Sequence, residues 1–149
     1  MTLRLILAAL FTVLPIAAPS IARENPVRNR VEGPVDAELI SVIDGDTLLV
    51  NARPWPQHTI AVLVRIRGID APEMKSKCEA SRRAAERAKD TLSRLATGRI
   101  QLTNISGDKY FGRIVADVTA GGDTDIGTAM IGSGLARYYD GGRKVRESC

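Results

Sequence analysis

The chain is poor in the residues that usually hold zinc: its 149 residues include one histidine and two cysteines. Zinc sites are built mainly from cysteine sulfurs and histidine nitrogens, and neither Cys78 nor Cys149 has a close partner of either kind in the sequence. The composition therefore argues against a zinc site and leaves oxygen atoms as the ligands for a metal ion.

Long apolar runs are also absent after the first residues of the chain. The one such run, Leu5 to Ala18, follows the positive charge of Arg4 and leads to Ser20-Ile21-Ala22. A positive start, a short apolar centre and a small-residue exit are typical of a secretory signal peptide, whereas a membrane-spanning helix needs about 20 apolar residues. The alternatives are an uncleaved anchor and a buried core helix. We expect residues 1–22 to be the signal peptide, cleaved after Ala22, of a periplasmic or secreted protein.

The rest of the chain has no internal repeat and no low-complexity tract, so its length predicts one domain. Residues 23–34 are polar, contain prolines and are typical of a flexible leader, which leaves residues 35–149 for the domain. The sequence has 21 basic and 17 acidic residues, a net charge of +4. This modest excess suits an anionic partner without proving one. We expect a monomer without stable membrane association after signal cleavage.

Short stretches of alternating apolar and β-branched residues predict five strands. Asp44-Gly45 is a strong turn signal between the first two. Arg53-Pro54-Trp55-Pro56 is expected to be a loop, because prolines remove donors from a strand ladder. The predicted strands are Val35–Ile43, Thr47–Val50, Thr59–Ile69, Ile100–Ile105 and Ile114–Val118.

One long helix and one short helix are also predicted. Glu79–Ala96 carries apolar residues at helical spacing among arginines and lysines, and Gly98 stands where a left-handed cap is expected. Asp125–Ser133 forms a second, weaker helix that Gly134 would stop. The apolar stripe of the long helix consists of Ala80, Ala84, Ala88, Leu92 and Leu95.

The order of these elements decides the fold class. Three strands, a helix, two strands and a short helix do not alternate regularly, as a parallel doubly wound sheet requires. A five-stranded barrel with a helix between its third and fourth strands accounts for the order, which is that of an oligonucleotide-binding barrel, or OB-fold. We therefore predict an α+β protein, mainly β, built on an OB-fold barrel.

Two short acidic segments are candidate metal ligands. Asp44-Gly45-Asp46 and Asp70-Ala71-Pro72-Glu73 each carry two carboxylates. Carboxylates and backbone carbonyls are the ligands that calcium prefers. Each segment alone is also typical of an ordinary polar turn, so only the two together indicate a metal site.

Three arginines suit a reaction at phosphate. Arg65 and Arg67 share a strand face, and Arg113 follows Phe111-Gly112. A phosphodiester under attack gathers negative charge on its oxygens, and forked, permanently charged guanidinium groups bind such charge well. A nearby carboxylate can take a proton from the attacking water. The alternative is solvated arginines on the outer face of a barrel, which is the interpretation favoured for Arg67.

Three motifs, in this order and at these separations, resemble the staphylococcal nuclease (thermonuclease) family. They are Val42-Ile43-Asp44-Gly45-Asp46-Thr47, Arg65-Ile66-Arg67-Gly68-Ile69-Asp70-Ala71-Pro72-Glu73 and Asp108-Lys109-Tyr110-Phe111-Gly112-Arg113. The stretch from Asp125 to Ala136 resembles the family's next helix and its end. The similarity extends from about Glu38 to Tyr139, and each motif alone would be weak.

The resemblance implies calcium-dependent cleavage of DNA and RNA that leaves a 3′-phosphate end. By position, Asp46 and Asp70 match the family's calcium-binding carboxylates, and Ala71 stands where the family contributes a backbone carbonyl. Glu73 matches the residue assigned as general base or water positioner. Asp44 is expected to shape the turn or to support the site from behind.

The resemblance also implies how the substrate is held. Arg65 and Arg113 match the two phosphate-binding arginines. Phe111 makes the third motif one residue longer than the usual family spacing, which leaves the roles of Tyr110 and Phe111 interchangeable. Base stacking on aromatic rings tolerates any sequence. The residues implied to contact the nucleotide are Lys109, Tyr110, Tyr138 and Tyr139.

The two cysteines predict a disulfide between Cys78 and Cys149, because an even count is typical of bridges in exported proteins. Such a bridge would tie the end of the chain to its middle and stabilise the fold by about 4 kcal/mol on the chain-entropy model. Two free thiols are the alternative.

A module that keeps the barrel and binds single-stranded nucleic acid without cutting it is the alternative function. Members of the family without chemistry usually lose several of the charged positions. This chain retains all five, namely Asp46, Arg65, Asp70, Glu73 and Arg113. We therefore predict a hydrolase that acts on phosphodiester bonds.

Overall fold

The computed structural model describes residues 29–142 and residue 149. The predicted signal peptide and most of the predicted leader lie outside the described residues. None of the helices in the described part of the chain combines the length and apolar character that crossing a bilayer requires.

The described chain contains nine strands and two helices. They are β1 (Arg30–Val31), β2 (Val35–Asp44), β3 (Thr47–Trp55), β4 (His58–Ile66), β5 (Ile69–Asp70), α1 (Glu79–Leu95), β6 (Ile100–Gly107), β7 (Arg113–Ala120), β8 (Thr124–Asp125), α2 (Ile126–Gly132) and β9 (Arg137–Tyr138).

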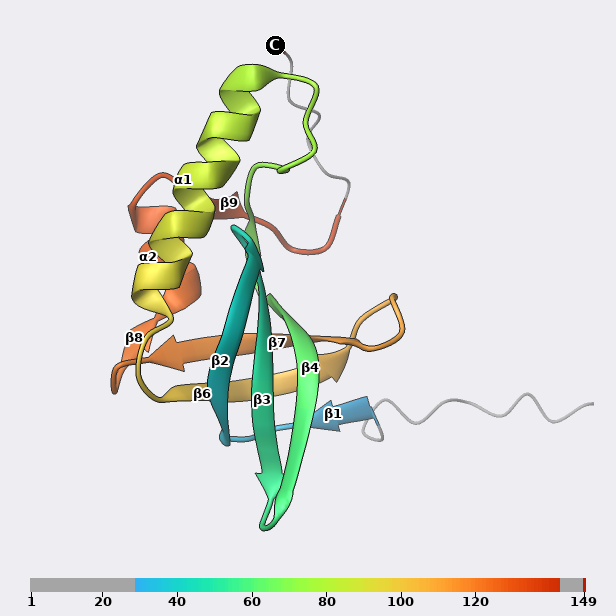
Figure 1. Ribbon diagram of the computed structural model, residues 1–149. Helices are drawn as coiled ribbons and strands as arrows, with labels where there is room; N and C mark the ends of the chain where they lie inside the picture. The colour runs from blue at the N-terminus through green and yellow to red at the C-terminus, as the bar shows by residue number, and fades with distance from the viewer. Residues whose placement is uncertain (1–28, 143–148) are drawn as a thin grey trace, which may run out of the picture.

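Strands β2, β3, β4, β6 and β7 form a closed barrel (Figure 1). β2, β3 and β4 pair antiparallel in sequence order, and β4 pairs parallel with β7. β6 pairs with both β2 and β7, which closes the barrel. α1 lies in sequence between the third and fourth barrel strands. The predicted OB-fold architecture is therefore confirmed.

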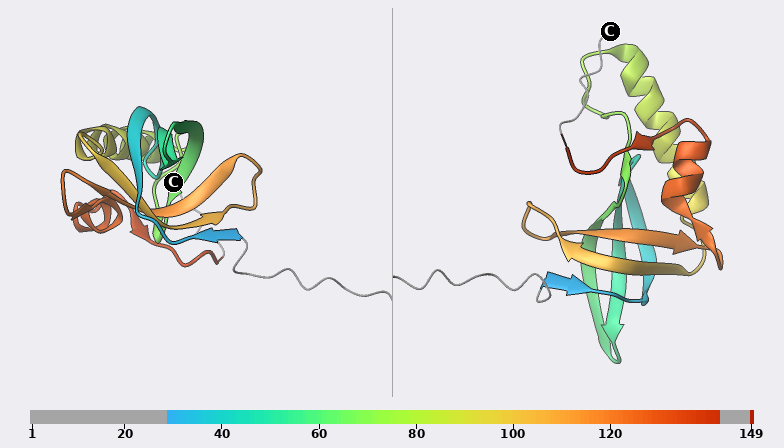
Figure 2. Two further views of the ribbon diagram at one scale, coloured as in Figure 1. Left: turned by 90° about the horizontal axis from the view of Figure 1, so that it is seen from below. Right: turned by 180° about the vertical axis from the view of Figure 1, so that it is seen from behind.

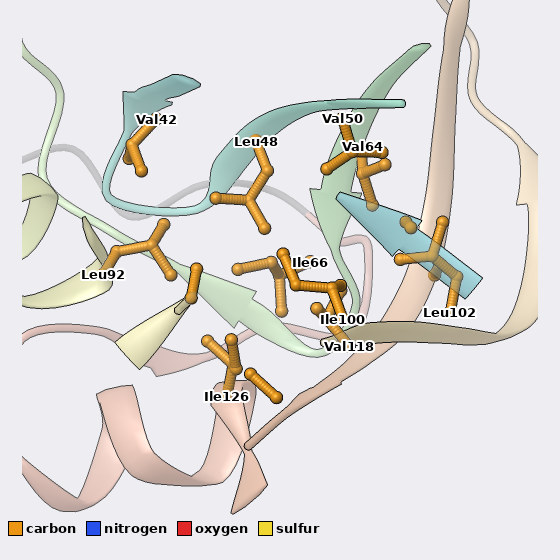
Figure 3. Close-up of a cluster of buried hydrophobic side chains, with 14 of the residues drawn as sticks. Val42, Leu48, Val50, Val64, Ile66, Leu92, Ile100, Leu102, Val118 and Ile126 are labelled. Atoms are coloured by element: carbon orange, nitrogen blue, oxygen red, sulfur yellow. The ribbon is translucent and has the colours of Figure 1, made fainter. Parts of the chain in front are cut away.

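The barrel interior is filled by alternate strand residues and by residues of both helices (Figure 3). Successive strand side chains point to opposite faces, so Leu48 and Val50 are fully buried while Leu49 is half-buried. Removal of these apolar groups from water is the main favourable contribution to folding. The labelled core residues are Val42, Leu48, Val50, Val64, Ile66, Leu92, Ile100, Leu102, Val118 and Ile126.

Helix α1 packs on β2 and α2 with part of its length. Ala85, Ala88 and Leu92 are buried, whereas Ala80 is exposed and Ala84 is half-buried. The predicted apolar stripe is thus wrong in its first half. Figure 1 shows the first turns of α1 extending beyond the barrel, where an apolar face has little to pack on.

Both helices end near the predicted glycines. Gly98 and Gly134 have left-handed backbone, with φ of 76° and 67°. The Asp125 side chain caps α2 by accepting a hydrogen bond of 2.6 Å from the Thr128 backbone N–H, which satisfies a donor that has no partner within the helix.

The β3–β4 hairpin is longer than predicted. Residues 53–55, expected to be a loop, continue β3, and β4 begins at His58. The strand register shifts between Ala52 and Trp55, so Pro54 lies at an irregular pairing where its missing N–H does not interrupt the ladder.

The strand predicted over Thr59–Ile69 is broken near its end. β4 stops at Ile66, Gly68 turns the chain with φ of 78°, and β5 follows. β5 pairs antiparallel with β9 instead of continuing in the barrel. This break brings Asp70 against the C-terminal segment.

The predicted leader contributes one short strand to the described structure. Arg30–Val31 forms β1, which pairs antiparallel with Ser106 and Ile105 of β6. The prediction of a flexible segment is wrong for these two residues, because their backbone groups pair with the edge of β6.

Gly45 lies where α1 approaches the β2–β3 turn. A Cβ atom on Gly45 would lie 2.6 Å from the Cβ of Ala71 and 2.7 Å from the Cβ of Ala88. Both distances are shorter than a van der Waals contact, so the position has no room for a side chain. Packing therefore requires this glycine in the first motif.

We predict that Gly45→Ala lowers the free energy of unfolding by about 1–3 kcal/mol, the usual effect of overpacking a core. Urea unfolding followed by circular dichroism measures the change. Gly132→Ala is the matched control, because its new methyl group would meet no atom within 4 Å. Coinciding curves for Gly45→Ala and the unmodified protein would contradict the packing argument.

Candidate active site

A cavity of about 960 Å³ opens between the β2–β3 turn, the end of β4, the segment after β5, the β6–β7 loop and the segment after β9. In Figures 1 and 2, the β6–β7 loop and the segment after β9 lie on the same side of the molecule. Asp70 lies next to this cavity and is ion-paired with Arg65. The other predicted site residues that line it are Asp46, Arg65, Ala71, Glu73, Lys109, Tyr110, Arg113, Tyr138 and Tyr139.

Asp46 is the most buried of the acids that line the cavity, with 4% of its surface exposed. Its Oδ1 accepts hydrogen bonds from Arg65 at 2.5 Å and from the Thr47 hydroxyl at 2.9 Å. Its Oδ2 accepts one from the Ala71 backbone N–H at 3.1 Å. The Asp44 carboxylate accepts the Asp46 backbone N–H at 3.1 Å, as expected for a residue that shapes the turn.

Arg65 joins two acids that are far apart in the sequence. Its side chain, 14% exposed, lies 2.5 Å from Asp46 Oδ1 and 3.4 Å from Asp70 Oδ1. Its guanidinium carbon lies 5.8 Å from the centre of the Tyr139 ring. Asp70 also pairs with Arg137 at 3.4 Å. Arg65 therefore connects the β2–β3 turn to β5 and β9 at the floor of the cavity.

Burial raises the pKa of Asp46 from 3.8 to about 6, although the positive charge of Arg65 acts in the opposite direction. The neighbouring Asp44 carboxylate adds to the rise by repulsion. A buried carboxylate loses its hydration, and this penalty falls on the charged form alone. Asp46 is therefore a site where a bound cation would relieve an unfavourable charge.

The oxygen atoms of Asp46, Asp70 and the Ala71 carbonyl are the kind of ligand that calcium takes. Within residues 29–142 and 149, no three His, Cys, Asp or Glu side chains are close enough to hold a metal ion by themselves. Calcium takes about 6–8 oxygens, so water and substrate oxygens would have to complete its shell. The donors fit an open site for a hard cation and do not form a closed structural site.

Arg113 enters the cavity from the first residue of β7. Asp108, at the other end of the β6–β7 loop, accepts a hydrogen bond from Arg113 Nε. Partial burial alone would raise the pKa of Asp108, but hydrogen bonds from Arg113 and from the Lys109 backbone N–H lower it below its usual value. The charged carboxylate thus fixes the position of the guanidinium group.

Tyr110 and Phe111 occupy different environments. The Tyr110 ring lines the cavity, 4.7 Å from the guanidinium carbon of Arg113 and 5.1 Å from Lys109 Nζ. Phe111 is fully exposed, at 109% of its reference surface. Of the two rings, Tyr110 lines the cavity and Phe111 does not.

Arg67 is not a solvated arginine, contrary to the favoured interpretation. Its guanidinium group donates to the backbone oxygens of Asn104 and Val115 and to the Ser106 hydroxyl, and it pairs with Asp117 at 3.3 Å. These contacts fasten the end of β4 to β6 and β7, the strands that carry the Asp108–Arg113 loop. Arg67 also lines the cavity, on the same side as Arg65.

Glu73 lies at the rim of the cavity in the segment between β5 and α1, and its side chain is exposed. Tyr138 also lines the cavity and is 75% exposed. The acid predicted to activate water and the rings predicted to contact bases therefore face one cavity.

The two cysteines, described as thiols, lie together at the start of α1. The end of the chain reaches the first turn of this helix (Figure 1). A hydrogen bond with the Cys149 thiol, and then one from the Ser81 backbone N–H, lowers the pKa of the Cys78 thiol to about 7. The disulfide itself stays a prediction.

Thr47, Asp108 and Arg137 have site contacts that the sequence interpretation did not assign. Thr47 and Asp108 lie within the motifs. A short polar side chain next to an acid or at a turn could have predicted these hydrogen bonds. Arg137 reaches Asp70 because β9 pairs with β5 over two residues. Nothing in the sequence marks so short a pairing.

A family model described as staphylococcal nuclease homologue matches residues 63–148, which is more than half of the chain. No curated protein matches the chain.

The raised pKa of Asp46 predicts a specific pH dependence of stability. Folding raises this pKa by about two units, so the folded state holds the proton more tightly and the free energy of unfolding falls as the pH rises from about 4 to about 6. At about 1.4 kcal/mol per unit, the change is about 3 kcal/mol. Asp46→Asn cannot ionise at this position and should not lose this stability. Its free energy of unfolding, relative to that of the unmodified protein, should therefore rise by this amount between pH 4 and pH 7.

Urea unfolding at both pH values measures the difference between the two proteins. Asp123→Asn, at an exposed position in the β7–β8 turn, corrects for the loss of one surface charge. Parallel pH curves for Asp46→Asn and the unmodified protein would show that burial does not raise this pKa.

Proposed function

The chain belongs to the staphylococcal nuclease homologue family, and on this basis we propose that it is a calcium-dependent nuclease that hydrolyses phosphodiester bonds of DNA and RNA. The observation that carries the proposal is the convergence of Asp46, Asp70, Arg65 and Arg113 at one cavity. The volume of this cavity suits a nucleotide, since small-molecule sites are typically about 300–1,000 Å³.

The arginines supply the electrostatic part of the mechanism. A phosphate in the cavity would receive hydrogen bonds from Arg65 on the floor and from Arg113 on the loop side. Both guanidinium groups are held by aspartates, Arg65 by Asp46 and Asp70 and Arg113 by Asp108. Donors that are fixed before the reaction stabilise the developing charge without having to reorganise.

Glu73 supplies the proton transfer. The exposed carboxylate takes a proton from a water molecule whose oxygen attacks phosphorus, and the bond from phosphorus to the 5′ oxygen breaks. The departing 5′ oxygen takes a proton from solvent and Glu73 returns its proton to solvent, which leaves a 3′-phosphate on one product and a 5′-hydroxyl on the other.

Calcium would be held by Asp46, Asp70 and the Ala71 carbonyl, and when bound it would polarise phosphate and water oxygens. The buried charge of Asp46 supports this assignment, because a cation offsets the desolvation that raises its pKa. Asp44 and the Thr47 hydroxyl orient Asp46 through hydrogen bonds, as supporting residues around metal ligands do.

The nucleotide would lie between two aromatic walls. Tyr110 with Lys109 stands on the β6–β7 loop, and Tyr138 and Tyr139 stand at the end of β9 and directly after it. Base stacking on such rings is sequence-tolerant, so the proposal includes both DNA and RNA as substrates. We also propose that the protein acts as a monomer without membrane association.

Export to the periplasm or secretion is part of the same proposal, together with a disulfide between Cys78 and Cys149. The adjacent thiols support this bond, and an oxidising compartment favours it. It would form by exchange with an external disulfide, which is reduced to two thiols while the chain's two thiols become one bridge.

We predict that Glu73→Gln lowers kcat on single-stranded DNA by about 10²–10⁴-fold, because general base catalysis contributes about this much. KM and the unfolding curve should change little, since the side chain is exposed. Digestion is followed with calcium and with a chelator. Glu79→Gln is the matched control, an exposed glutamate in the first turn of α1.

Equal digestion by the unmodified protein, Glu73→Gln and Glu79→Gln would contradict the assigned role of Glu73. Binding of single-stranded DNA without cleavage under every calcium condition would replace the nuclease by a binding module.

For the cysteines, we predict that the oxidised protein exceeds the reduced protein by about 4 kcal/mol in free energy of unfolding. Non-reducing mass spectrometry should show the loss of two hydrogen atoms in the oxidised form. Cys78→Ser should unfold like the reduced protein with or without reductant. An unmodified protein whose melting curve does not respond to reductant would rule out a stabilising bridge.

A further inference from the structure

Phe111 is the most exposed large apolar side chain of the described residues, and the site as assigned above does not use it. It lies at the tip of the β6–β7 loop, directly after Tyr110, which lines the cavity. Leaving a phenylalanine ring in water forgoes about 1.5–3 kcal/mol that its burial would contribute. A ring presented in this way at the edge of a binding site is suited to a ligand that covers it.

The loop holds this ring in a defined place. The Arg113 backbone N–H donates to the Tyr110 carbonyl at 3.3 Å, which makes residues 110–113 a turn with Phe111 at its second position. Gly112 supplies the left-handed residue of the turn, with φ of 81°. The base of the loop is closed by the Asp108 backbone N–H, which donates to the Arg113 carbonyl at 3.1 Å. Phe111 is therefore displayed by a hydrogen-bonded turn.

The surroundings of the ring indicate what would cover it. Lys109 and Arg113 flank the tip with positive charge, and both line the cavity. Lys109 is exposed, while the Arg113 side chain is 23% exposed. Proteins bind unpaired nucleotides with aromatic rings that stack on the bases and with positively charged side chains that contact the phosphate backbone. Phe111 with its two basic neighbours has this arrangement.

We propose that Phe111 forms an additional subsite, in which an unpaired base next to the nucleotide in the cavity stacks on its ring. The proposal rests on the function proposed above, because the cavity must hold the neighbouring nucleotide. The subsite takes only an unpaired base, since a paired base is already stacked and is not free to cover the ring.

The test measures binding without cleavage, in the presence of a chelator, with a fluorescent single-stranded 12-nucleotide DNA and its blunt duplex. Phe111→Ala should weaken binding of the single strand about tenfold, the size expected for one stacked base, and should leave duplex binding unchanged. Phe111→Trp should restore single-strand affinity, because the indole ring also stacks.

Trp55→Ala is the matched control. Trp55 is likewise an exposed aromatic, 56% exposed, but lies at the tip of the β3–β4 hairpin outside the cavity lining. Its removal should change neither affinity. A parallel digestion with calcium tests the nuclease function separately, so that absence of cleavage with intact Phe111-dependent binding would reject the enzyme and keep the subsite.

Three results would overturn the subsite. One is equal single-strand affinity of Phe111→Ala and the unmodified protein, and another is absence of measurable single-strand binding. The third is that Phe111→Ala changes binding to a membrane or to a second copy of the chain and leaves single-strand affinity unchanged. Sedimentation with vesicles of anionic phospholipid measures binding to a membrane, and gel filtration of the protein alone measures self-association.

Discussion

The ion pairs that Arg65 makes with two buried aspartates are the interaction on which the rest of the site depends. Asp46 comes from the β2–β3 turn and Asp70 from β5, and Arg65 lies between them at 2.5 and 3.4 Å. Buried charges are strongly unfavourable unless they are paired and hydrogen bonded, so these three side chains have to fold together. The Ala71 N–H and the Thr47 hydroxyl complete the hydrogen bonding of Asp46. The site is thus part of the structural framework of the barrel end.

This arrangement does not satisfy Asp46 fully, because burial keeps its pKa at about 6 despite the neighbouring arginine. A charged carboxylate held in this way lowers the stability of the fold. A bound cation would restore the electrostatic interaction that the carboxylate lost on burial. The other half of the cavity is built independently. Asp108 positions Arg113 across the β6–β7 loop, and Arg67 fastens the strands that carry this loop. Arg65 and Arg67, at the end of β4 and directly after it, therefore take part both in the contacts that hold the fold together and in those that build the proposed site.

The barrel, and the residues of the three motifs that line the cavity, could be predicted from the sequence, because strand alternation and three ordered motifs specify them. What failed depends on contacts that local patterns do not encode. Arg67 donates to Ser106 and pairs with Asp117 on the neighbouring strands, and the pairing of β5 with β9 brings Arg137 to Asp70. Gly45 was identified as a turn residue, but its requirement comes from the approach of Ala88 on a distant helix. The separation of Tyr110 from Phe111 likewise needed the conformation of the loop.

The central claim is that Asp46, Asp70 and Arg65, with Arg113 opposite, form one site for a cation and a phosphate. A crystal structure with calcium and a short phosphorothioate DNA tests it most directly. The account predicts one calcium ion bound by Asp46, Asp70 and the Ala71 carbonyl, with a phosphorothioate group between the ion, Arg65 and Arg113. Calcium and DNA bound elsewhere on the molecule, with the cavity holding neither, would contradict it.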